Sequence, residues 1–483
     1  MPSPAPEPIH IEAERLSGLL DTIAARIGRA HVVTDPANLA PHLIEGRGLY
    51  RGATPALVRP GSTEEVAFAV AACAAAGVPF VPQGGNTGLV GGQMPFGALL
   101  ISLSRLTRIR DLDPTDLTVT VEAGVTLAGV QEAAREAGCL FPLSIAAEGS
   151  CQIGGNLSTN AGGTAVLRYG NMRELALGLE VVLPDGRVWH GLSRLRKDNT
   201  GYDLKDLFIG AEGTLGIITA AVLRLFPAPR QRATALVGLD GPHAALRLFR
   251  RLRAVAGDAL TGFEIMPRFG MEMVLKHMPG TVRALKGDHA FYVLAELTST
   301  RDEDDLAAMV LAVLADAFEA AEVEDAVIAA SEAQAGALWR LREDLSDAQK
   351  FEGGSIKHDV SVPVSKVADF IVEATRRCEA HMGGLRVCAF GHMGDGNVHF
   401  NLSQPVGMDK QAFIDTWEEF NRIVHDLVAA LGGSISAEHG IGLLKKEELT
   451  LYKDPVALDV MAAVKAALDP QGLANPGKVL MGR

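Results

Sequence analysis

The sequence predicts an α+β protein, with a glycine-rich first half that forms mixed sheets and a second half built on an antiparallel sheet. The first half repeats a unit of helix, glycine stop and short strand, at residues 62–82 and again at residues 126–143. In the second half, extended runs such as residues 233–239 and 290–297 alternate with longer helical runs. This alternation favours an antiparallel sheet with helices on one face.

The two repeated units carry local signals for where each helix begins and ends. A capping box that starts at Ser62 opens the first helix, which we expect to stop at Gly77. The second helix starts at Thr126 and also stops at a glycine. Residues 98–103 and 117–124 lie between the two units and are rich in the residue types that favour strands. We therefore expect two strands between the helices.

The segment PAPRQ, residues 227–231, predicts a domain boundary because its prolines and polar residues are typical of linkers. Beyond it we expect helices at residues 242–257 and 302–321. Residues 432–442 look extended, and a small C-terminal helical segment follows them. The expected parts of the chain are residues 1–229, 230–432 and 433–483.

Composition limits the classes of function. The 483-residue chain is 48% hydrophobic and 21% charged, as an ordinary globular protein is. A net charge of −13 argues against binding to nucleic acid or to anionic membranes. Five cysteines form no CxxC pair, which favours a reducing cytoplasmic location. The longest apolar run, residues 66–81, is shorter than the roughly 20 residues that span a bilayer, so we expect no integral membrane segment.

The stretch GHMGDGNVHFN, residues 391–401, holds two histidines around an Asp-Gly step. Asp-Gly favours a two-residue hairpin turn, which would place His392 directly opposite His399. The α-carbons of such a pair are roughly 4.5 to 5.5 Å apart and the side chains share a face. Two imidazoles placed in this way can chelate a metal. A hairpin with two ordinary polar residues facing solvent remains the alternative.

Two glycine-rich segments follow predicted strands. PQGGNTGLVGG, residues 82–92, matches neither the Rossmann nor the Walker pattern, but clustered glycines let backbone amides approach phosphate oxygens. Residues 148–174 combine glycines with serine, threonine and asparagine. Together the segments favour a large phosphate-bearing cofactor held by backbone and hydroxyl groups. Two structural loops are the alternative.

Several motifs resemble one flavoprotein family. PQGGNTGLVGG and, at residues 153–163, 168–186 and 201–219, IGGNLSTNAGG, RYGNMRELALGLEVVLPDG and GYDLKDLFIGAEGTLGIIT resemble the FAD domain of vanillyl-alcohol oxidase-type flavoproteins. GHMGDGNVHFN, SAEHGIG and LDPQGLANPGK are similar to the D-2-hydroxy-acid dehydrogenase branch, especially the bacterial D-2-hydroxyglutarate dehydrogenases. The resemblance covers nearly all of the chain, in order. It implies a two-subdomain, PCMH-type FAD-binding region at residues 1–229 (about 50–229), a substrate-binding cap at 230–432, and a segment at 433–483 that completes the active site.

The resemblance also implies which residues bind the cofactor. Asn86 stands where some members of the wider family carry a histidine tethered to the flavin, so we expect non-covalent FAD. The residues expected around the pyrophosphate, the flavin and the adenine end are Pro82, Gly84, Gly85, Asn86, Thr87, Gly88, Gly149, Ser150, Gly154, Gly155, Asn156, Ser158, Asn160, Gly213, Ile218 and Asn475.

By the same resemblance, His392, His399 and Glu438 hold a divalent metal, usually zinc. Three protein ligands leave positions open, as in catalytic sites. His439 follows Glu438 directly, and both can line one site only if the backbone bends, which Gly440 permits. We assign His439 as the general base; a hydrogen-bonding role beside the metal is the alternative.

An acidic protein needs local cations to bind an acidic substrate. Arg342 and Ser346 are spaced i and i+4, which predicts that they share one face of a helix. Lys357 lies in an extended run, and Asn401 lies two residues after His399. The resemblance points to Arg342, Ser346 and Lys357 as substrate-binding. Asn401, on the same strand face as His399, can also reach the site. An ordinary surface charge is the alternative for Arg342 and for Lys357.

The expected function is oxidation of D-2-hydroxyglutarate to 2-oxoglutarate, by hydride transfer to FAD. D-lactate, D-malate or glycolate would suit the same chemistry. A non-redox flavin enzyme or a zinc hydrolase is a more distant alternative. The sequence holds no second redox motif, so electrons must pass to an external acceptor, by resemblance an electron-transfer flavoprotein or a quinone-linked carrier. Relatives of this type are often dimers, which leaves room for a homodimer.

Overall fold

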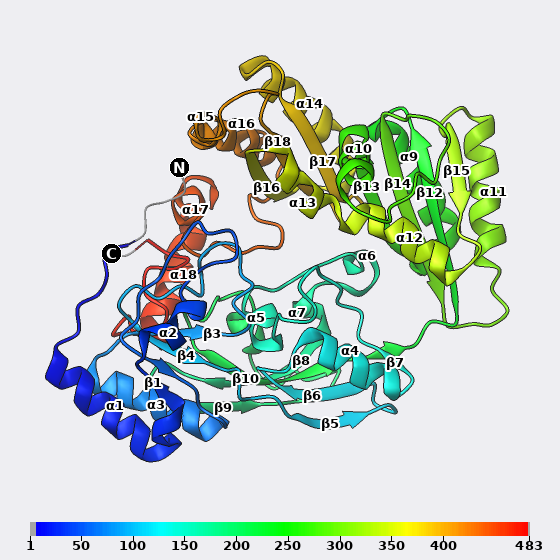
Figure 1. The fold of residues 1–483 in the computed structure, drawn as a ribbon. Helices are drawn as coiled ribbons and strands as arrows, with labels where there is room; N and C mark the ends of the chain where they lie inside the picture. The colour runs from blue at the N-terminus through cyan, green and yellow to red at the C-terminus, as the bar shows by residue number, and fades with distance from the viewer. Residues whose placement is uncertain (1–5, 482–483) are drawn as a thin grey trace. The chain divides into compact units, whose positions relative to one another are not determined.

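The computed structural model describes residues 6–481 and divides into two compact units (Figure 1). One unit, here called the seven-stranded unit, contains residues 163–170 and 228–437. The other, the two-sheet unit, contains the described residues up to Gly162, residues 171–227 and the C-terminal residues from Glu438. The chain passes between the units at Pro227, inside the PAPRQ segment.

The two-sheet unit contains a mixed four-stranded sheet of order β1-β2-β4-β3 and an antiparallel five-stranded sheet of order β5-β6-β10-β8-β9. This confirms the mixed sheets predicted for the first half. Its strands are β1 (Val32–Val33), β2 (Leu57–Val58), β3 (Phe80–Gln83), β4 (Leu99–Ser102), β5 (Ile109–Asp113), β6 (Thr118–Glu122), β7 (Cys139–Leu140), β8 (Ala176–Val182), β9 (Val188–Gly191), β10 (Ile217–Arg224) and β11 (Phe226–Pro227). Its α-helices are α1 (Ala13–Ile27), α2 (Pro36–Leu39), α3 (Thr63–Ala76), α4 (Leu127–Glu136), α5 (Ile153–Ser158), α7 (Met172–Leu175), α8 (Lys205–Phe208), α17 (Lys446–Tyr452) and α18 (Pro455–Leu468).

The predicted helix signals locate the starts of α3 and α4, although the capping box at Ser62 is only half formed, since Glu65 accepts the amide of Gly61 rather than that of Ser62. The Ser62 hydroxyl accepts the amide of Glu65, and Gly77 ends α3 in the left-handed conformation with φ 58°. The Thr126 hydroxyl accepts the amide of Gly129 at the start of α4. Side-chain acceptors at these positions satisfy backbone amides that have no partner within the helix.

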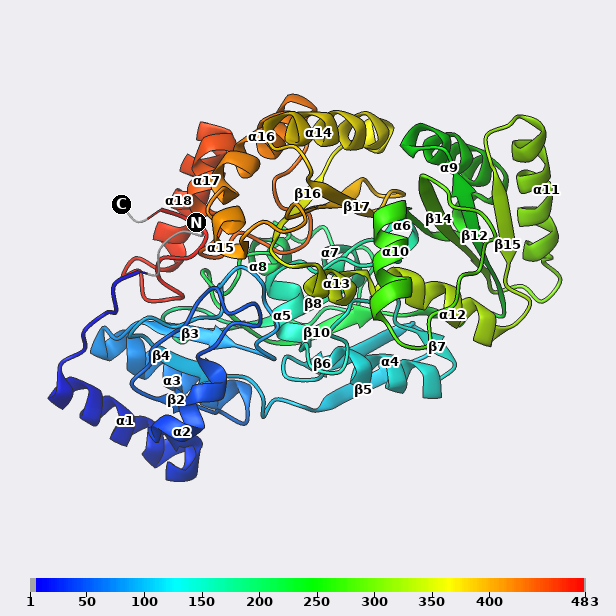
Figure 2. The same cartoon turned by 45° about the horizontal axis from the view of Figure 1, so that its top comes forward.

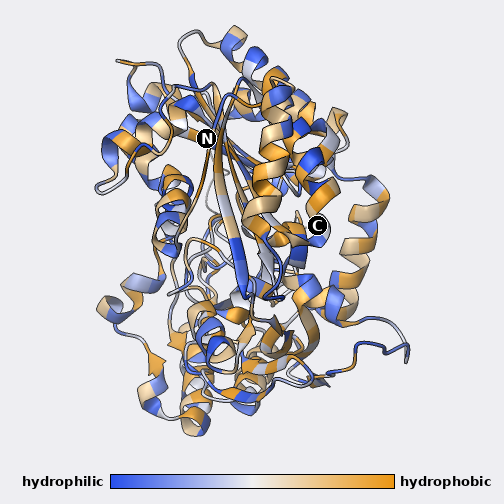
Figure 3. Ribbon diagram, turned by 90° about the vertical axis from the view of Figure 1, so that its right-hand side faces the viewer, coloured by the Kyte–Doolittle hydropathy of each residue, from blue (hydrophilic) through white to orange (hydrophobic). Residues whose placement is uncertain are grey.

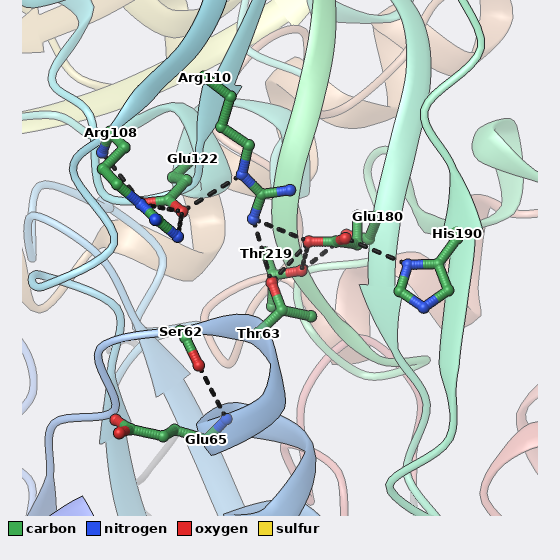
Figure 4. Close-up of polar contacts among 9 residues, drawn as sticks. All are labelled: Ser62, Thr63, Glu65, Arg108, Arg110, Glu122, Glu180, His190 and Thr219. Atoms are coloured by element: carbon green, nitrogen blue, oxygen red, sulfur yellow. Dashed lines mark hydrogen bonds and ion pairs between the residues drawn. The ribbon is translucent and has the colours of Figure 1, made fainter.

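A buried ion-pair network ties the start of α3 to the five-stranded sheet (Figure 4). Arg110 on β5 lies 3.2 Å from the Glu122 carboxylate and 3.0 Å from that of Glu180, each from guanidinium nitrogen to carboxylate oxygen. The Thr63 hydroxyl donates to Glu180 at 2.5 Å. Both carboxylates are buried and paired, so the network holds the first turn of α3 against the five-stranded sheet.

The seven-stranded unit is a single antiparallel sheet of order β15-β12-β14-β13-β17-β18-β16. Its strands are β12 (Gln231–Leu239), β13 (Leu260–Pro267), β14 (Phe291–Ser299), β15 (Asp325–Ile328), β16 (Ser355–Ser361), β17 (Arg386–His392) and β18 (Asn397–Ser403). Its α-helices are α6 (Val166–Tyr169), α9 (Pro242–Ala256), α10 (Arg268–His277), α11 (Leu306–Glu319), α12 (Glu332–Glu343), α13 (Leu345–Ala348), α14 (Val367–His381), α15 (Lys410–Ile414) and α16 (Trp417–Ala430).

One face of this sheet packs against the long helices α9, α11, α14 and α16 in a large hydrophobic core. Figure 3 shows helices that carry both hydrophobic and hydrophilic residues, as helices at the surface of a protein do. On the second face, α10, α12 and α13 cover the part of the sheet around β13 and β14. In Figure 2, α14 and α13 lie on opposite sides of the sheet. On this second face β16 and β18 present polar side chains, which form the candidate site.

The strand expected at residues 432–442 is absent, and that prediction was wrong. Among the described residues of this segment only Ser434 pairs with a strand, through an isolated bridge to Ser361. Gly432, Gly440 and Gly442 adopt φ values of 74°, 81° and 51°, which interrupt an extended backbone. Within residues 6–481, no helix combines the length and the apolar character needed to cross a membrane.

Candidate active site

The glycine-rich loop at residues 82–92 leaves the end of β3 and packs against the second glycine-rich segment. A Cβ on Gly85 would lie 1.9 Å from the carbonyl oxygen of Ser150, so only glycine allows this close approach. Asn86 adopts a left-handed conformation with φ 56°, and its side-chain amide donates to the carbonyl of Ile44 at 3.0 Å. The two segments predicted to hold the cofactor are therefore in contact.

The second segment forms the short helix α5 and its flanking loops. A Cβ on Gly154 would lie 2.8 Å from that of Ala123, which explains the glycine. The Ser158 hydroxyl donates to the carbonyl of Gly154 at 2.7 Å, and the Asn160 side-chain oxygen accepts the amide of Arg173 at 2.9 Å. These two polar side chains, both expected near the flavin, also stabilise their own segment.

A third segment, residues 212–218, joins the same region. A Cβ on Gly213 would lie 2.5 Å from the Pro82 ring, so the chain after Glu212 lies against the start of the first glycine-rich loop. Ile218 is buried in β10, where it pairs with β8.

Two buried oxygens test whether this region fits a large cofactor. Among the described residues, the side-chain oxygens of Gln152 and Asn475 are buried and have no hydrogen-bond partner. The Asn475 amide nitrogen donates to the carbonyls of Gly92 and Glu212, at 2.9 and 2.7 Å, which fixes the orientation of the side chain. Unpartnered buried acceptors next to closely packed glycine loops fit a ligand that carries amine or hydroxyl donors, as FAD does.

Glu212 is a buried residue of the two-sheet unit that sequence reasoning missed. Its carboxylate accepts the backbone amides of Ile441 and Gly442, at 2.7 and 2.9 Å. Burial raises the pKa of Glu212 to about 7, although these amides and the charges of Lys445 and Lys478 act in the other direction. Glu212 thus anchors the loop that follows His439. The only sequence signal was a glutamate among small residues in GAEGTLG.

The histidine hairpin of the seven-stranded unit has a different register from the predicted one. His399 pairs with Phe390, and the amides of Asp395 and Gly396 both bond to the carbonyl of His392 at 3.2 Å, so the turn is longer than two residues. The prediction that His392 lies directly opposite His399 was wrong. The two rings nevertheless lie close together, with their centroids 5.5 Å apart. Diagonal neighbours on a sheet face can still make contact.

Glu264 on β13 is directly opposite His392 and was also missed by sequence reasoning. One carboxylate oxygen lies 2.7 Å from His392 Nδ1, and the other accepts Arg342 Nε at 2.6 Å. Burial raises the pKa of Glu264, but the charges of His392 and Arg342 outweigh burial and lower it to about 2. A lone glutamate in the apolar strand GFEIMP was the available signal.

The strand β16 adds a lysine and an aspartate to the same face. Lys357 pairs with Asn401, and Asp359 pairs with His399, so these four side chains share one face. An Asp359 carboxylate oxygen lies 3.6 Å from His399 Nδ1 and accepts the Asn397 side-chain amide at 2.9 Å. The Asn401 side chain donates to Gln349 at 2.9 Å.

The i and i+4 spacing predicted that Arg342 and Ser346 share a helix face. In the structure they do not. The helix α12 ends at Glu343, and Ser346 lies in the separate short helix α13. Arg342 is buried, whereas Ser346 is exposed. A break at Asp344 replaces the continuous helix that the prediction required.

Glu438 enters this neighbourhood through chain connectivity. The amide of Ala437, the preceding residue, donates to the carbonyl of Asp359 at 3.3 Å. His392, His399 and Glu438 each offer one ligand atom, and these atoms lie within 4.8 Å of one another. Asp359, Glu438 and His439 form a second grouping of the same kind. Imidazole and carboxylate donors in such numbers fit a divalent metal such as zinc.

Comparison with known proteins places the chain in a family. Residues 54–191 match the FAD binding domain family, and residues 228–479 match the C-terminal domain of FAD linked oxidases. The chain is 39% identical to a D-2-hydroxyglutarate dehydrogenase of Xanthomonas citri pv. viticola, over 92% of this chain and 93% of the relative. The chain belongs to the FAD-linked D-2-hydroxy-acid dehydrogenases. The resemblance inferred from the motifs is therefore confirmed.

Other relatives of this family agree. The mitochondrial D-2-hydroxyglutarate dehydrogenase of Bos taurus is 37% identical over 95% of this chain and 83% of its own. Among solved structures, p-cresol methylhydroxylase aligns with a TM-score of 0.77 at 18% identity, over 99% of both chains. Alkyldihydroxyacetonephosphate synthase aligns with a TM-score of 0.72 at 17% identity, over 99% of this chain and 88% of its own. These structural likenesses confirm the predicted fold class.

Proposed function

We propose that this protein oxidises D-2-hydroxyglutarate to 2-oxoglutarate with FAD and a divalent metal, and passes the electrons to an external carrier. The observation that carries the proposal is the polar face of the seven-stranded unit, where two neighbouring histidines, two cations and buried acids gather on one end of an otherwise apolar sheet. The names of the relatives support the substrate.

The FAD would be held by the glycine-rich segments at residues 82–92 and 148–160, with Asn475 and Gln152 supplying acceptors. When bound there, FAD would supply the acceptor for the hydride from C2 of the substrate. Asn86, which replaces the histidine used for tethering, supports non-covalent binding.

The metal would be held by His392, His399 and Glu438, whose ligand atoms are grouped suitably. A divalent ion held there would supply Lewis-acid chemistry that lowers the pKa of a bound hydroxyl group. The imidazole of His439 takes the hydroxyl proton of the substrate as the C2 hydride leaves, so that the C–O single bond becomes a carbonyl.

Arg342, Lys357 and Asn401 would bind the substrate carboxylates. Two cationic side chains on one face suit a substrate with two carboxylates, which favours hydroxyglutarate over lactate. D-malate, D-lactate or glycolate with the same chemistry is the second candidate. Ser346, which is exposed, would take at most a minor part.

The electron acceptor, the location and the assembly stay predictions. We expect an electron-transfer flavoprotein or a quinone-linked carrier as acceptor and leave room for a homodimer. All five cysteines are buried and free, which supports the cytoplasmic location expected from their number. Several relatives are named as mitochondrial.

The proposal is tested by adding D-2-hydroxy acids to the purified protein without oxygen, before and after chelator treatment. We expect a yellow protein that bleaches with D-2-hydroxyglutarate, bleaches less with D-lactate, and does not bleach with the L isomers. Replacement of His439 by Asn should abolish bleaching while FAD and metal remain bound. Bleaching that survives complete metal removal would contradict the metal's role, and a colourless protein would contradict the flavin chemistry.

A further inference from the structure

The two carboxylate oxygens of Glu264 contact two different residues, which is unusual for a buried glutamate beside an arginine. A buried glutamate paired with arginine commonly forms two parallel hydrogen bonds to the guanidinium fork. Here one oxygen lies 2.7 Å from His392 Nδ1 and only the other accepts from Arg342, at 2.6 Å. Glu264 is fully buried, so both contacts form away from water.

The contact with His392 decides which ring nitrogen can bind a metal. A carboxylate next to Nδ1 holds a proton on that nitrogen, because it can only accept. The lone pair of a neutral His392 then resides on Nε2, the other ring nitrogen. Carboxylate partners of this kind orient metal-ligating histidines and raise their basicity.

The contact with Arg342 decides which guanidinium nitrogens remain for a ligand. Arg342 uses Nε toward Glu264, which leaves its two terminal nitrogens as the donors for a substrate carboxylate. The guanidinium carbon also lies 4.8 Å from the centre of the Phe390 ring. The carboxylate on one side and the ring beside it fix the plane of the guanidinium group.

The position of Glu264 is explained by this double contact rather than by packing. Its neighbours on the strand, Phe263 and Ile265, face the large hydrophobic core. Met266, two residues on and on the same face as Glu264, packs into the second hydrophobic cluster. An acid at this point breaks the apolar pattern of the strand, and such local conflicts are expected at functional positions.

We infer that Glu264 is a positioning residue for two binding sites at once: one carboxylate oxygen sets the tautomer of His392 for the metal, and the other orients Arg342 for the substrate. This inference rests on the proposed function, because it assigns His392 to the metal and Arg342 to the substrate. If Glu264 has this double role, a single substitution weakens both the metal site and the substrate site.

The substitution Glu264→Gln tests this. An amide has one acceptor oxygen and no negative charge, so the partner that its oxygen serves is held more weakly and the other partner loses its acceptor altogether. When its NH₂ group faces His392, it favours the proton on Nε2 and blocks the metal-binding nitrogen. We expect the affinity of the metal-free holoflavoprotein for Zn²⁺ to fall about 10- to 100-fold, and the KM for D-2-hydroxyglutarate to rise about tenfold.

Glu296→Gln is the matched control. Glu296 lies on the neighbouring strand β14 and, like Glu264, accepts from two side chains, Trp339 at 2.7 Å and Thr234 at 3.0 Å. Neither partner belongs to the proposed sites. We expect Zn²⁺ affinity and KM within about twofold of wild type in this variant, because a partly buried acid on the neighbouring strand is neutralised without touching either site.

The measurements are Zn²⁺ titration against a chromophoric chelator and steady-state KM, with flavin content and melting temperature as checks of folding. Loss at only one of the two sites, or at neither, would overturn the inference. If Glu264→Gln does not fold, Glu264→Asp, whose shorter side chain cannot reach both partners, must show the loss at one site or more; wild-type values at both would overturn the inference.

Failure of the inference can be separated from failure of the proposed function. If wild type binds Zn²⁺, His399→Ala does not, and Glu264→Gln binds like wild type, the metal site stands and only the role of Glu264 is wrong. If wild type itself binds no Zn²⁺, the metal site and the inference both fail.

Discussion

Glu212 in the two-sheet unit and Glu264 in the seven-stranded unit are both buried glutamates, but they are compensated differently. Glu212 accepts two backbone amides and has a pKa raised by burial to about 7. For Glu264 burial also raises the pKa, but its contacts with His392 and Arg342 overcome that effect and lower it to about 2. The comparison shows that backbone amides can hold a buried carboxyl group in place without keeping it charged. A neighbouring cation both holds the group in place and keeps it charged.

The two environments suit different tasks. A carboxylate held permanently charged by its partners is suited to orienting a metal ligand and a substrate-binding cation. A carboxyl group with a near-neutral pKa is suited to fixing a loop, here residues 440–444, next to the glycine-rich region. Changes in the seven-stranded unit should therefore remove chemistry and spare FAD, while changes at Glu212 should act through the loop.

The largest expected effect follows removal of a proposed metal ligand. His399→Ala should slow flavin reduction by D-2-hydroxyglutarate at least about 10³-fold, because the loss of the metal removes several kcal/mol of transition-state stabilisation. FAD content should equal that of wild type. Anaerobic stopped-flow absorbance and metal analysis check both values. A rate within tenfold of wild type would show that the metal site does not take part in the chemistry.

Glu212→Ala should have an intermediate effect, a fall in kcat of about tenfold, because the amides of Ile441 and Gly442 lose their acceptor and the loop after His439 loosens. The matched variant is Glu45→Ala. Glu45 is also buried and accepts two backbone amides, those of Arg47 and Leu49 at 3.0 and 3.1 Å, but it holds a different loop. Equal losses of kcat in the two variants would remove any special role for Glu212.

The raised pKa of Glu212 makes a signed prediction for stability. Its folded pKa of about 7 is above the unfolded value, so the folded state binds the extra proton between about pH 4.5 and pH 7. The contribution of Glu212 to the free energy of unfolding is therefore fully present below pH 4.5 and is lost as pH rises through 7. Glu212→Gln, which stays neutral, should gain about 1 to 3 kcal/mol relative to wild type between pH 5 and pH 7.5. Urea unfolding at both pH values measures this; a constant difference would show that Glu212 is ionised throughout.

The smallest expected effect distinguishes the observed position of Ser346 from the shared helix face with Arg342 that the sequence pattern predicted. Because Ser346 is exposed on its own helix, Ser346→Ala should change KM by less than about threefold. Arg342→Ala, which removes a buried cation, should raise KM about 100-fold. Steady-state kinetics with D-2-hydroxyglutarate compares the two, and a large effect at Ser346 would restore the prediction of a shared helix face.

The sequence alone was sufficient for features set by local signals. The helix signals at Ser62, Gly77 and Thr126 correctly located α3 and α4. The proximity of His392 and His399 was also predicted from a short stretch of chain, although the register was not, because the turn closes onto the His392 carbonyl rather than at Asp-Gly alone.

Features that depend on strand order or on long-range contacts could not be predicted. Glu264 reaches His392 because β13 pairs with β17, strands separated by 128 residues at this contact. Glu212 reaches Gly442 across 230 residues. No spacing rule connects such residues, and in each case the only trace was an acid in an apolar or glycine-rich run.

The most direct test of the central claim is the anaerobic rate of flavin reduction by D-2-hydroxyglutarate in wild-type protein that has been stripped of metal and then resupplied with Zn²⁺. We expect a yellow protein that is not reduced when metal-free, is reduced rapidly after Zn²⁺ is restored, and does not respond to the L isomer in either state. Equal reduction rates with and without the metal would contradict the claim.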